Sequence, residues 1–368
     1  MTISIFLFIG LFIVSIQAAV PYLLKRNIVF GVTIPNTYTD ESTLSSYKRS
    51  YSLIIASTGI IAMGAFALWA LSTNAGEEKV VLTGTAIQFG ILLLSMALYF
   101  LFHAKISRLK HQNHWGTDLK QVRITDLAIR TADEMLPWTI YLLPMLITIG
   151  LIAYTVTQYA NLPELIPTHW GIDGQPDAFS KKTPFSSIAL LLILFIMQGM
   201  MLAINEFTKR SGIKISATNK KKSRAQQLSF RKYSSWFLFA IVLLMTVLFG
   251  FLQLGTIHED IGNPALLFAL PIGFLVIIFI LTGIYAFKVG QGGTRLDVDI
   301  IDEDVEGITD YDDDRYWKGG IIYFNKNDPS IFVEKRFGVG WSLNFGHPIG
   351  YFILFGPILL ILAISFFM

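Results

Sequence analysis

Long apolar runs separated by polar loops are the main feature of this 368-residue chain. A helix needs about 20 apolar residues to cross the hydrocarbon core of a bilayer. Eight runs come close to or exceed this length: 3–24, 53–71, 80–102, 136–159, 185–205, 236–254, 265–287 and 348–367. The pattern therefore predicts an all-α polytopic membrane protein with eight transmembrane helices.

The basic residues are distributed unevenly among the loops between these runs. The loops after the first, third, fifth and seventh runs contain 4, 6, 9 and 7 of the 29 Lys and Arg residues, whereas the other three contain 1, 2 and 0. Basic residues beside membrane spans stay on the cytoplasmic side. The asymmetry predicts that both termini are extracytoplasmic, that the loop 161–184 is outside, and that the loops 207–234 and 288–347 are inside.

The interior of the spans carries little that could drive chemistry. The composition is 53% hydrophobic and 15% charged, and no ionisable residue lies in the middle of a run. Ion-coupled transporters normally need such groups, so a transporter is disfavoured. Gln88, Gln198 and Gln253 remain as polar residues, for which we expect interhelical hydrogen bonds. The absence of cysteine excludes disulfides and thiolate metal sites.

The outer loop 161–184 contains the densest motif on the exposed side. Its prolines and glycines predict an ordered set of turns. Two interpretations of its polar residues are open: a ligand or metal site, or a turn in which Asp177 caps a backbone amide and His169 bonds within the loop. One histidine with two carboxylates is a weak metal signal, so we expect no metal and no cofactor. The candidate residues are Glu164, Pro167, His169, Gly171, Gly174 and Asp177.

The inner loop 207–234 has nine basic residues and no acidic one. Anionic headgroups attract each nearby basic residue by about 1 kcal/mol, so lipid is the expected partner and nucleic acid is disfavoured. The proposed lipid-facing residues are Lys220, Lys221, Lys222 and Arg224.

The inner loop 288–347 combines an acidic stretch with strand signals. Alternation at 296–300 predicts a strand, and ten acidic residues lie within 297–314. We expect part of that stretch to dock on the basic loops 103–135 or 207–234, with apolar contacts supplying most of the attachment. The runs 321–324 and 331–333 predict a β-hairpin around 325–329.

Two segments resemble known families. Leu-Pro-Glu-Leu-Ile-Pro-Thr-His-Trp at 162–170, followed by Gly-Gln-Pro-Asp and Lys-Lys, resembles the signature of the domain of unknown function 1648, which occurs in immunity proteins against the sporulation-delaying killing toxin of bacilli. Residues 31–35 are similar to the Gly-Ile-Arg-Thr-Pro loop of that immunity family, with Thr33 near the arginine position. Residues 316–346 resemble the domain of unknown function 5808, which commonly closes proteins that carry domain 1648. The motif residues are Trp317, Asn325, Asp328, Lys335, Arg336, Trp341 and Asn344.

These resemblances imply a multi-pass protein of the bacterial cell membrane. We expect four regions: three helices with their loops (1–135), the 1648-like helix pair (136–210), helices six and seven with the basic loop (211–287), and the 5808-like segment with the last helix (288–368). No motif of a hydrolase or nucleotide-binding enzyme is present, so we expect no enzyme. The expected function is toxin immunity or signalling, in which the outer loop meets an extracellular peptide or envelope component and the inner domain contacts a cytoplasmic regulator. The alternatives are a transporter or exporter subunit, and a structural or assembly factor.

Overall fold

The computed structural model describes residues 2–124, 132–171, 174–258, 261, 264–298, 300 and 307–367. Eight helices in this part of the chain are long and apolar enough to cross a membrane. They are α1 (Thr2–Leu23), α2 (Ser42–Ser72), α3 (Glu77–Gln112), α4 (Trp138–Thr157), α5 (Ala189–Arg210), α6 (Lys220–Ile257), α7 (Pro264–Ile284) and α8 (Pro348–Phe367). The prediction of an eight-span, mainly helical membrane protein is confirmed.

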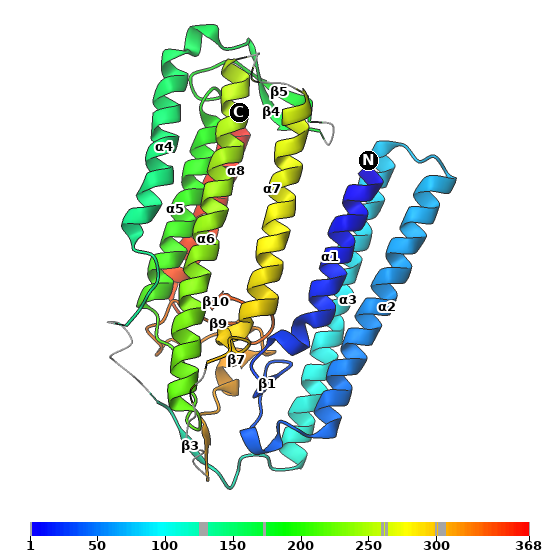
Figure 1. The fold of residues 1–368 in the computed structure, drawn as a ribbon, viewed down its shortest axis with the longest axis vertical. Helices are drawn as coiled ribbons and strands as arrows, with labels where there is room; N and C mark the ends of the chain where they lie inside the picture. The colour runs from blue at the N-terminus through cyan, green and yellow to red at the C-terminus, as the bar shows by residue number, and fades with distance from the viewer. Residues whose placement is uncertain are drawn as a thin grey trace.

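The helices form two groups that stand side by side (Figure 1). One group contains α1, α2 and α3, which contact one another, and the other contains α4 to α8, in which α5 contacts α4, α6 and α8. An aromatic contact links the groups within the apolar region, because the ring of Phe12 on α1 stacks on that of Phe279 on α7 at 4.1 Å between centroids. The chain passes from one group to the other between the end of α3 at Gln112 and the start of α4 at Trp138.

Short strands occupy both ends of the bundle. The pairs are β1 (Ile28–Val29) with β2 (Val32–Thr33), β3 (Lys120–Val122) with β6 (Ile308–Asp310), β4 (Leu165–Trp170) with β5 (Pro176–Lys181), β7 (Trp317–Lys318) with β8 (Ile322–Tyr323), and β9 (Phe332–Glu334) with β10 (Trp341–Leu343). Only β3–β6 is parallel among them. The β4–β5 pair and both termini lie at one end, called here the hairpin end, and the other strands lie at the opposite end, called the junction end (Figure 1).

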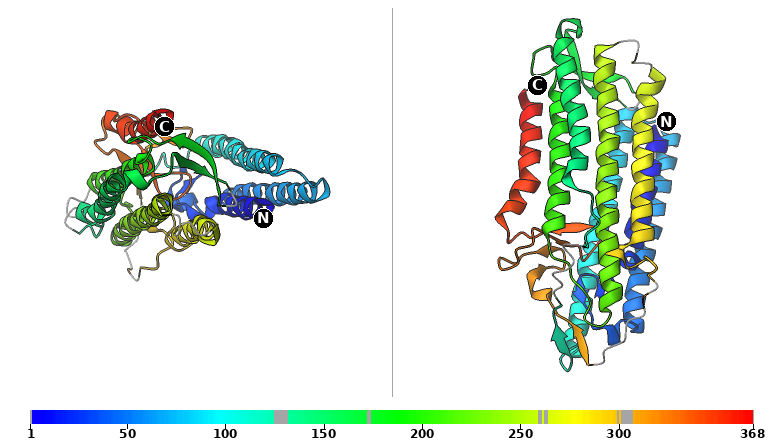
Figure 2. Two further views of the ribbon diagram at one scale, coloured as in Figure 1. Left: turned by 90° about the horizontal axis from the view of Figure 1, so that it is seen from above. Right: turned by 60° about the vertical axis from the view of Figure 1, so that its left-hand side comes forward.

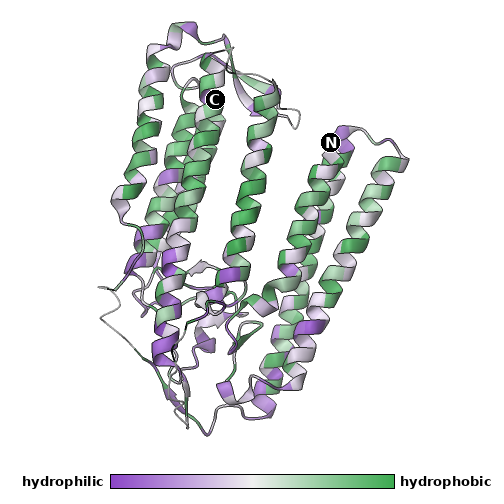
Figure 3. Cartoon of the chain, viewed as in Figure 1, coloured by the Kyte–Doolittle hydropathy of each residue, from purple (hydrophilic) through white to green (hydrophobic). Residues whose placement is uncertain are grey.

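Three helices, α2, α3 and α6, extend far beyond the apolar region into the junction end. An α-helix rises about 1.5 Å per residue, so the 38 residues of α6 span about 57 Å, whereas the hydrocarbon core is about 30 Å thick. Hydrophilic residues gather on these extensions, and apolar residues cover the middle of each helix (Figure 3). Lys220 begins α6, 16 residues before Trp236. The extensions therefore form a polar platform next to the membrane-spanning part.

Uncharged polar side chains connect the helices inside the bundle, as predicted. Gln198 on α5 is fully buried, and its Nε2 donates to Thr148 Oγ1 on α4 and to Thr246 Oγ1 on α6, both at 2.9 Å. Gln253 Nε2 on α6 donates to Thr155 Oγ1 on α4 at 3.3 Å and to the Ser187 carbonyl before α5 at 3.0 Å. Gln88 Nε2 similarly donates to the carbonyl of Phe6 on α1, at 3.2 Å. The expectation of interhelical hydrogen bonds for the three glutamines is confirmed.

The strand pairing in the loop 288–347 differs from the prediction. The runs 321–324 and 331–333 do not pair with each other. Instead β8 pairs with β7 across a turn at Gly319 and Gly320, which have φ of +59° and +74°, and β9 pairs with β10. Three residues, Gly319 to Ile321, separate the paired Lys318 and Ile322. Glycine readily adopts the positive φ that such a short loop needs, so a hairpin closes earlier in the chain than expected.

The strand predicted at 296–300 is also not formed in the described residues of that range. The strand nearest to it is β6, further along the acidic stretch. Residues 299 and 301–306 lie outside the described part of the chain.

Candidate functional site

The outer-loop motif folds into the β4–β5 hairpin at the hairpin end. Pro167 lies opposite Phe179 in the strand register, and a bulge follows it before His169. The Gly171 N–H donates to the Gln175 carbonyl at 2.8 Å. The sequence prediction of an ordered set of turns is therefore confirmed, because prolines and glycines close a paired structure here.

His169 and Asp177 form a pair on the surface of this hairpin. The imidazole Nδ1 lies 2.5 Å from Asp177 Oδ1, and the two side chains are 69% and 53% exposed. Glu164 lies at the start of the hairpin, where its carbonyl accepts from the Lys182 N–H at 2.9 Å. The structure thus brings together two of the three predicted polar residues. Among the described residues, no group of three or more His, Cys, Asp or Glu is placed to hold a metal ion.

Gly174 fixes the hairpin against the start of α7. A Cβ atom at this position would lie 2.7 Å from the Phe268 backbone nitrogen and 2.8 Å from the Leu267 carbonyl carbon. The backbone of the hairpin therefore touches the backbone of the helix, which leaves no room for a side chain. Gly174 therefore allows the hairpin and α7 to pack backbone against backbone. The side chains of His169 and Asp177 remain exposed to solvent.

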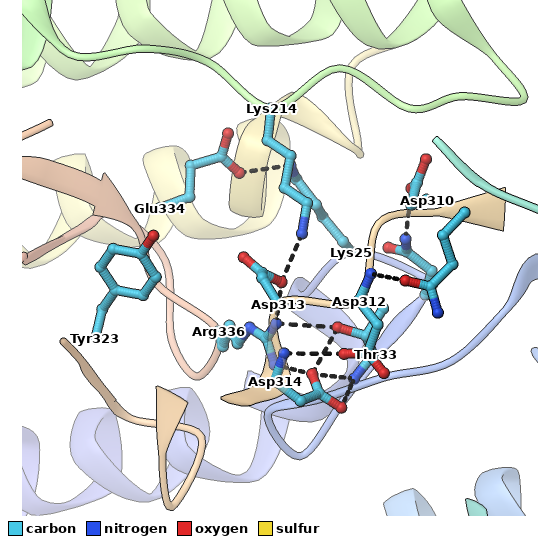
Figure 4. Close-up of polar contacts among 12 residues, drawn as sticks. Lys25, Thr33, Lys214, Asp310, Asp312, Asp313, Asp314, Tyr323, Glu334 and Arg336 are labelled. Carbon is cyan, nitrogen blue, oxygen red and sulfur yellow. Dashed lines mark hydrogen bonds and ion pairs between the residues drawn. The ribbon is translucent and has the colours of Figure 1, made fainter. Parts of the chain in front are cut away.

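Arg336 is the central residue of the junction end. Its guanidinium is buried and donates to the Gly31 carbonyl at 2.6 Å and to Thr33 Oγ1 at 3.0 Å. It also forms ion pairs with Asp313 and Asp314 (Figure 4). Because Gly31 and Thr33 follow α1 and the other residues follow α7, this one side chain joins the N-terminal helices to the C-terminal segment.

The acidic stretch docks on both basic loops. Lys110, on the extension of α3, lies 2.5 Å from Asp312 and 2.8 Å from Asp314, and Lys214 lies 2.8 Å from Asp313. The parallel β3–β6 pair adds backbone contacts between 120–122 and 308–310. For the described part of the stretch, the prediction that it docks on loops 103–135 or 207–234 is confirmed for both loops.

These charges stabilise one another. Burial opposes ionisation of Asp314, but Arg336 and Lys110 outweigh it and hold the pKa of that carboxyl well below its usual value. Burial likewise opposes the charge on Asp313, whose pKa is lowered by Lys214 and Arg336. For Arg336, burial alone would lower the pKa, and the two carboxylates raise it. Asp313, Asp314 and Arg336 are therefore ionised at neutral pH.

Aromatic contacts supply the apolar part of the docking. Phe337 follows Arg336 and inserts between the extensions of α2 and α3, with its ring 4.2 Å from that of Tyr99 and 6.2 Å from that of Tyr51. Trp317 lies beneath the guanidinium, 5.0 Å from ring centroid to Arg336 Cζ. A cation over an aromatic face is stabilised by the ring quadrupole. Ionic and apolar contacts thus hold the same segment in place.

Asn344 organises the rest of the 5808-like segment. It is fully buried, and its Nδ2 donates to the carbonyls of Asn325, Asp328 and Ser330 at 2.9–3.1 Å. Its Oδ1 accepts from the Asn325 N–H at 3.0 Å. Tyr323 donates to the Asp328 carboxylate at 2.8 Å. The motif residues Asn325, Asp328 and Asn344 therefore build a polar core, and their role is structural.

Two further ion pairs were not apparent from the sequence. Lys25, after α1, lies 2.5 Å from Glu334 at the end of β9 (Figure 4). Arg231 on α6 lies 2.6 Å from Asp133, and both side chains are almost completely buried. Arg231 also donates to the Lys209 carbonyl at 2.6 Å. Their charges are visible in the sequence, but no spacing rule relates residues so far apart.

A cavity of about 1160 Å³ with many charged residues in its lining lies at the junction end, and it is called here the junction chamber. It lies between the end of α1, the segment 209–227 from the end of α5 to the first turns of α6, and the strands β6 to β9. Its lining contains nine Lys and Arg residues against five Asp and Glu. Five buried atoms of lining residues lack a hydrogen-bond partner among the described residues: Gln227 Oε1, Arg231 Nε, Thr294 Oγ1, Trp317 Nε1 and Glu334 Oε1. The lining therefore has a formal excess of basic over acidic side chains.

The basic run 220–224 occupies the far tip of α6. Lys220, Lys221 and Lys222 are exposed and Arg224 is partly buried. At about 1.5 Å per residue, Lys221 lies about 22 Å before Trp236, where the apolar part begins. Lipid contact of this run stays a prediction, and the geometry places the lysines well away from the apolar boundary.

The two ends of the bundle match different family models. Residues 146–196, from within α4 to the first part of α5, match a domain of unknown function (DUF1648), and residues 326–351, from the 325–329 turn to the start of α8, match a family of unknown function (DUF5808). An uncharacterized protein of Archaeoglobus fulgidus is 29% identical over 150 residues, which cover 37% of this chain and 76% of the relative. No solved structure matches the chain. The chain is therefore similar to DUF1648 where it carries the His169–Asp177 hairpin, and to DUF5808 where it carries Arg336.

Proposed function

We propose that this chain is a non-enzymatic membrane receptor of the toxin-immunity and signalling type. The β4–β5 hairpin would lie outside the cell and meet an extracellular peptide or an envelope component. The junction end would lie in the cytoplasm and present the junction chamber to an anionic cytoplasmic regulator. The unequal distribution of basic residues supports this orientation, with both termini outside.

One observation carries the proposal: a single helix, α5, connects the two sites. It begins eight residues after β5 and ends at Arg210. The next residue, Ser211, accepts from the Phe332 N–H of β9 at its Oγ (3.2 Å) and from Arg231 at its carbonyl (3.0 Å). A shift of the hairpin that moves α5 along its axis therefore acts directly on the strand that precedes Arg336.

The resemblance to the toxin-immunity family supports the same function. The loop that is similar to its Gly-Ile-Arg-Thr-Pro motif lies at the junction end, with Thr33 in contact with Arg336 and Asp314. Where the motif has an arginine, this chain has Thr33, and the guanidinium beside that position comes from Arg336. The immunity assignment accordingly rests on this resemblance and on the hairpin, and it remains a proposal.

A deletion strain challenged with cationic antimicrobial peptides and envelope stresses tests the proposal. We expect the strain to be sensitive and the wild-type gene to restore protection. His169→Ala and Asp177→Ala should remove protection at normal protein levels, because each leaves the exposed pair incomplete. Glu78→Ala is the matched control, since that exposed carboxylate lies in the first turn of α3, outside the hairpin. Full protection by both pair variants would contradict a ligand-binding hairpin and would favour its role as a turn.

A further inference from the structure

An apolar groove lies where α5, α8 and the β9–β10 pair meet. Its volume is about 300 Å³. Seven apolar side chains of these elements line it: Met200, Ile204, Phe332, Trp341, Leu343, Ile353 and Leu354. Ile353 and Leu354 lie in the second turn of α8, so the groove is at the depth where this helix enters the apolar region. On the same turn, Phe352 is 78% exposed on the outer side of the bundle, where α8 runs along its edge (Figure 2).

Lys335 lies where this groove borders the junction chamber. It is exposed, and it lines both the groove and the junction chamber. Its neighbours in the chain are each paired, Glu334 with Lys25 and Arg336 with Asp313 and Asp314. The Lys335 ammonium has no carboxylate partner among the described residues. The lining of the chamber beyond it contains nine Lys and Arg residues and five Asp and Glu residues.

We propose that this groove binds an anionic phospholipid, with part of one acyl chain in the groove and the phosphate at Lys335. The apolar lining and the membrane depth of Ile353 fit a hydrocarbon chain, and the unpaired ammonium where the groove borders the chamber fits a phosphate. Basic pockets beside transmembrane helices are a recurrent site for acidic headgroups. A zwitterionic lipid would bring its own cation to a surface with more basic than acidic side chains, and would bind less well there.

The bound lipid would connect α8 to the remainder of the protein. Among the helices, α8 has its main contacts with α5, and most of its side chains are not buried. A chain seated between α5 and α8, with its phosphate beside β9, would contact all three elements. The lipid would therefore act next to the Ser211–Phe332 contact, through which α5 reaches β9.

Trp341 provides a direct probe, because it lines the groove and brominated acyl chains quench tryptophan fluorescence on contact. The full-length protein is placed in phosphatidylcholine nanodiscs that contain equal fractions of dibrominated phosphatidylglycerol or dibrominated phosphatidylcholine. The share of Trp341 in the signal is obtained by comparison with Trp341→Phe. We expect stronger quenching of this share by the anionic lipid. Equal quenching by the two lipids would overturn the proposal.

Variants distinguish the contribution of the Lys335 charge from that of the apolar groove. Lys335→Gln should remove the preference for the anionic lipid, and Lys326→Gln, an exposed lysine that lines neither cavity, should keep it. Ile204→Phe narrows the groove without changing its charge and should weaken quenching by both lipids. An unchanged preference in Lys335→Gln, or unchanged quenching in Ile204→Phe, would contradict the site. Inorganic phosphate should not reduce the quenching, and displacement of the lipid by phosphate would instead assign Lys335 to a soluble anion.

Discussion

Replacing Arg336 by methionine should destabilise the protein by about 3–5 kcal/mol, because breaking a buried ion pair leaves uncompensated charge behind. The guanidinium is 4% exposed and serves two carboxylates, a backbone carbonyl and a hydroxyl. Methionine has a similar length and no donors, so Asp313 and Asp314 would each lose a cation. Arg336→Lys keeps the charge but not the fork of donors, and should fall between methionine and the wild type.

Thermal unfolding of the purified protein in detergent measures this effect. The matched control is Arg315→Met, because Arg315 is exposed and donates only to the hydroxyls of Tyr311 and Tyr316. Substitutions at such exposed sites usually change stability by about 0.5 kcal/mol or less. Equal melting temperatures of Arg336→Met and Arg315→Met would show that Arg336 does not hold the two helix groups together.

Gly293→Ala is expected to have the second large effect, a loss of about 2–5 kcal/mol from strain and overpacking together. A Cβ at this position would lie 2.2 Å from the Gln226 carbonyl oxygen and 2.9 Å from its carbon. These atoms belong to the backbone of α6, which cannot move without shifting the helix. Gly293 also has φ of +75°, a conformation that L-residues rarely adopt.

Gly338→Ala separates the two causes. Gly338 has φ of +91°, and a Cβ there would meet nothing within 4 Å. Gly338→Ala should therefore lower the free energy of unfolding only by the cost of the backbone conformation, about 1–2 kcal/mol. The measurement is the yield of folded protein and its melting temperature for both variants. If Gly293→Ala is no less stable than Gly338→Ala, the contact between the loop after α7 and α6 is not tight.

The membrane-spanning architecture was predictable because it depends on local composition. Each helix has to present about 20 apolar residues to lipid, and this requirement is visible in the sequence without knowledge of the partners. The last span, 348–367, coincides with α8. The ends of the polar extensions of α2, α3 and α6 could not be predicted from apolar runs, because a helix outside the bilayer can be polar on all sides.

The candidate sites were predictable only in part. The sign of the charges indicated that the acidic stretch docks on the basic loops, yet the individual partners, such as Lys214 with Asp313, depend on the tertiary fold. The prediction of a hairpin around 325–329 was wrong, because the turn at Gly319 and Gly320 pairs β8 with β7 instead. The His169–Asp177 pair was within the predicted motif, but a bulge in β4 sets its register, and apolar alternation does not reveal a bulge.

The central claim of the proposed function is that the β4–β5 hairpin lies outside the cell and that the junction end lies in the cytoplasm. Single cysteines can test this, because the chain has none. Ala178→Cys places an exposed thiol on β5, and Lys221→Cys places one at the tip of α6. A membrane-impermeant maleimide should label Ala178→Cys in intact cells and Lys221→Cys only after the membrane is permeabilised. Labelling of both thiols in intact cells, or of Lys221→Cys alone, would contradict the proposed topology.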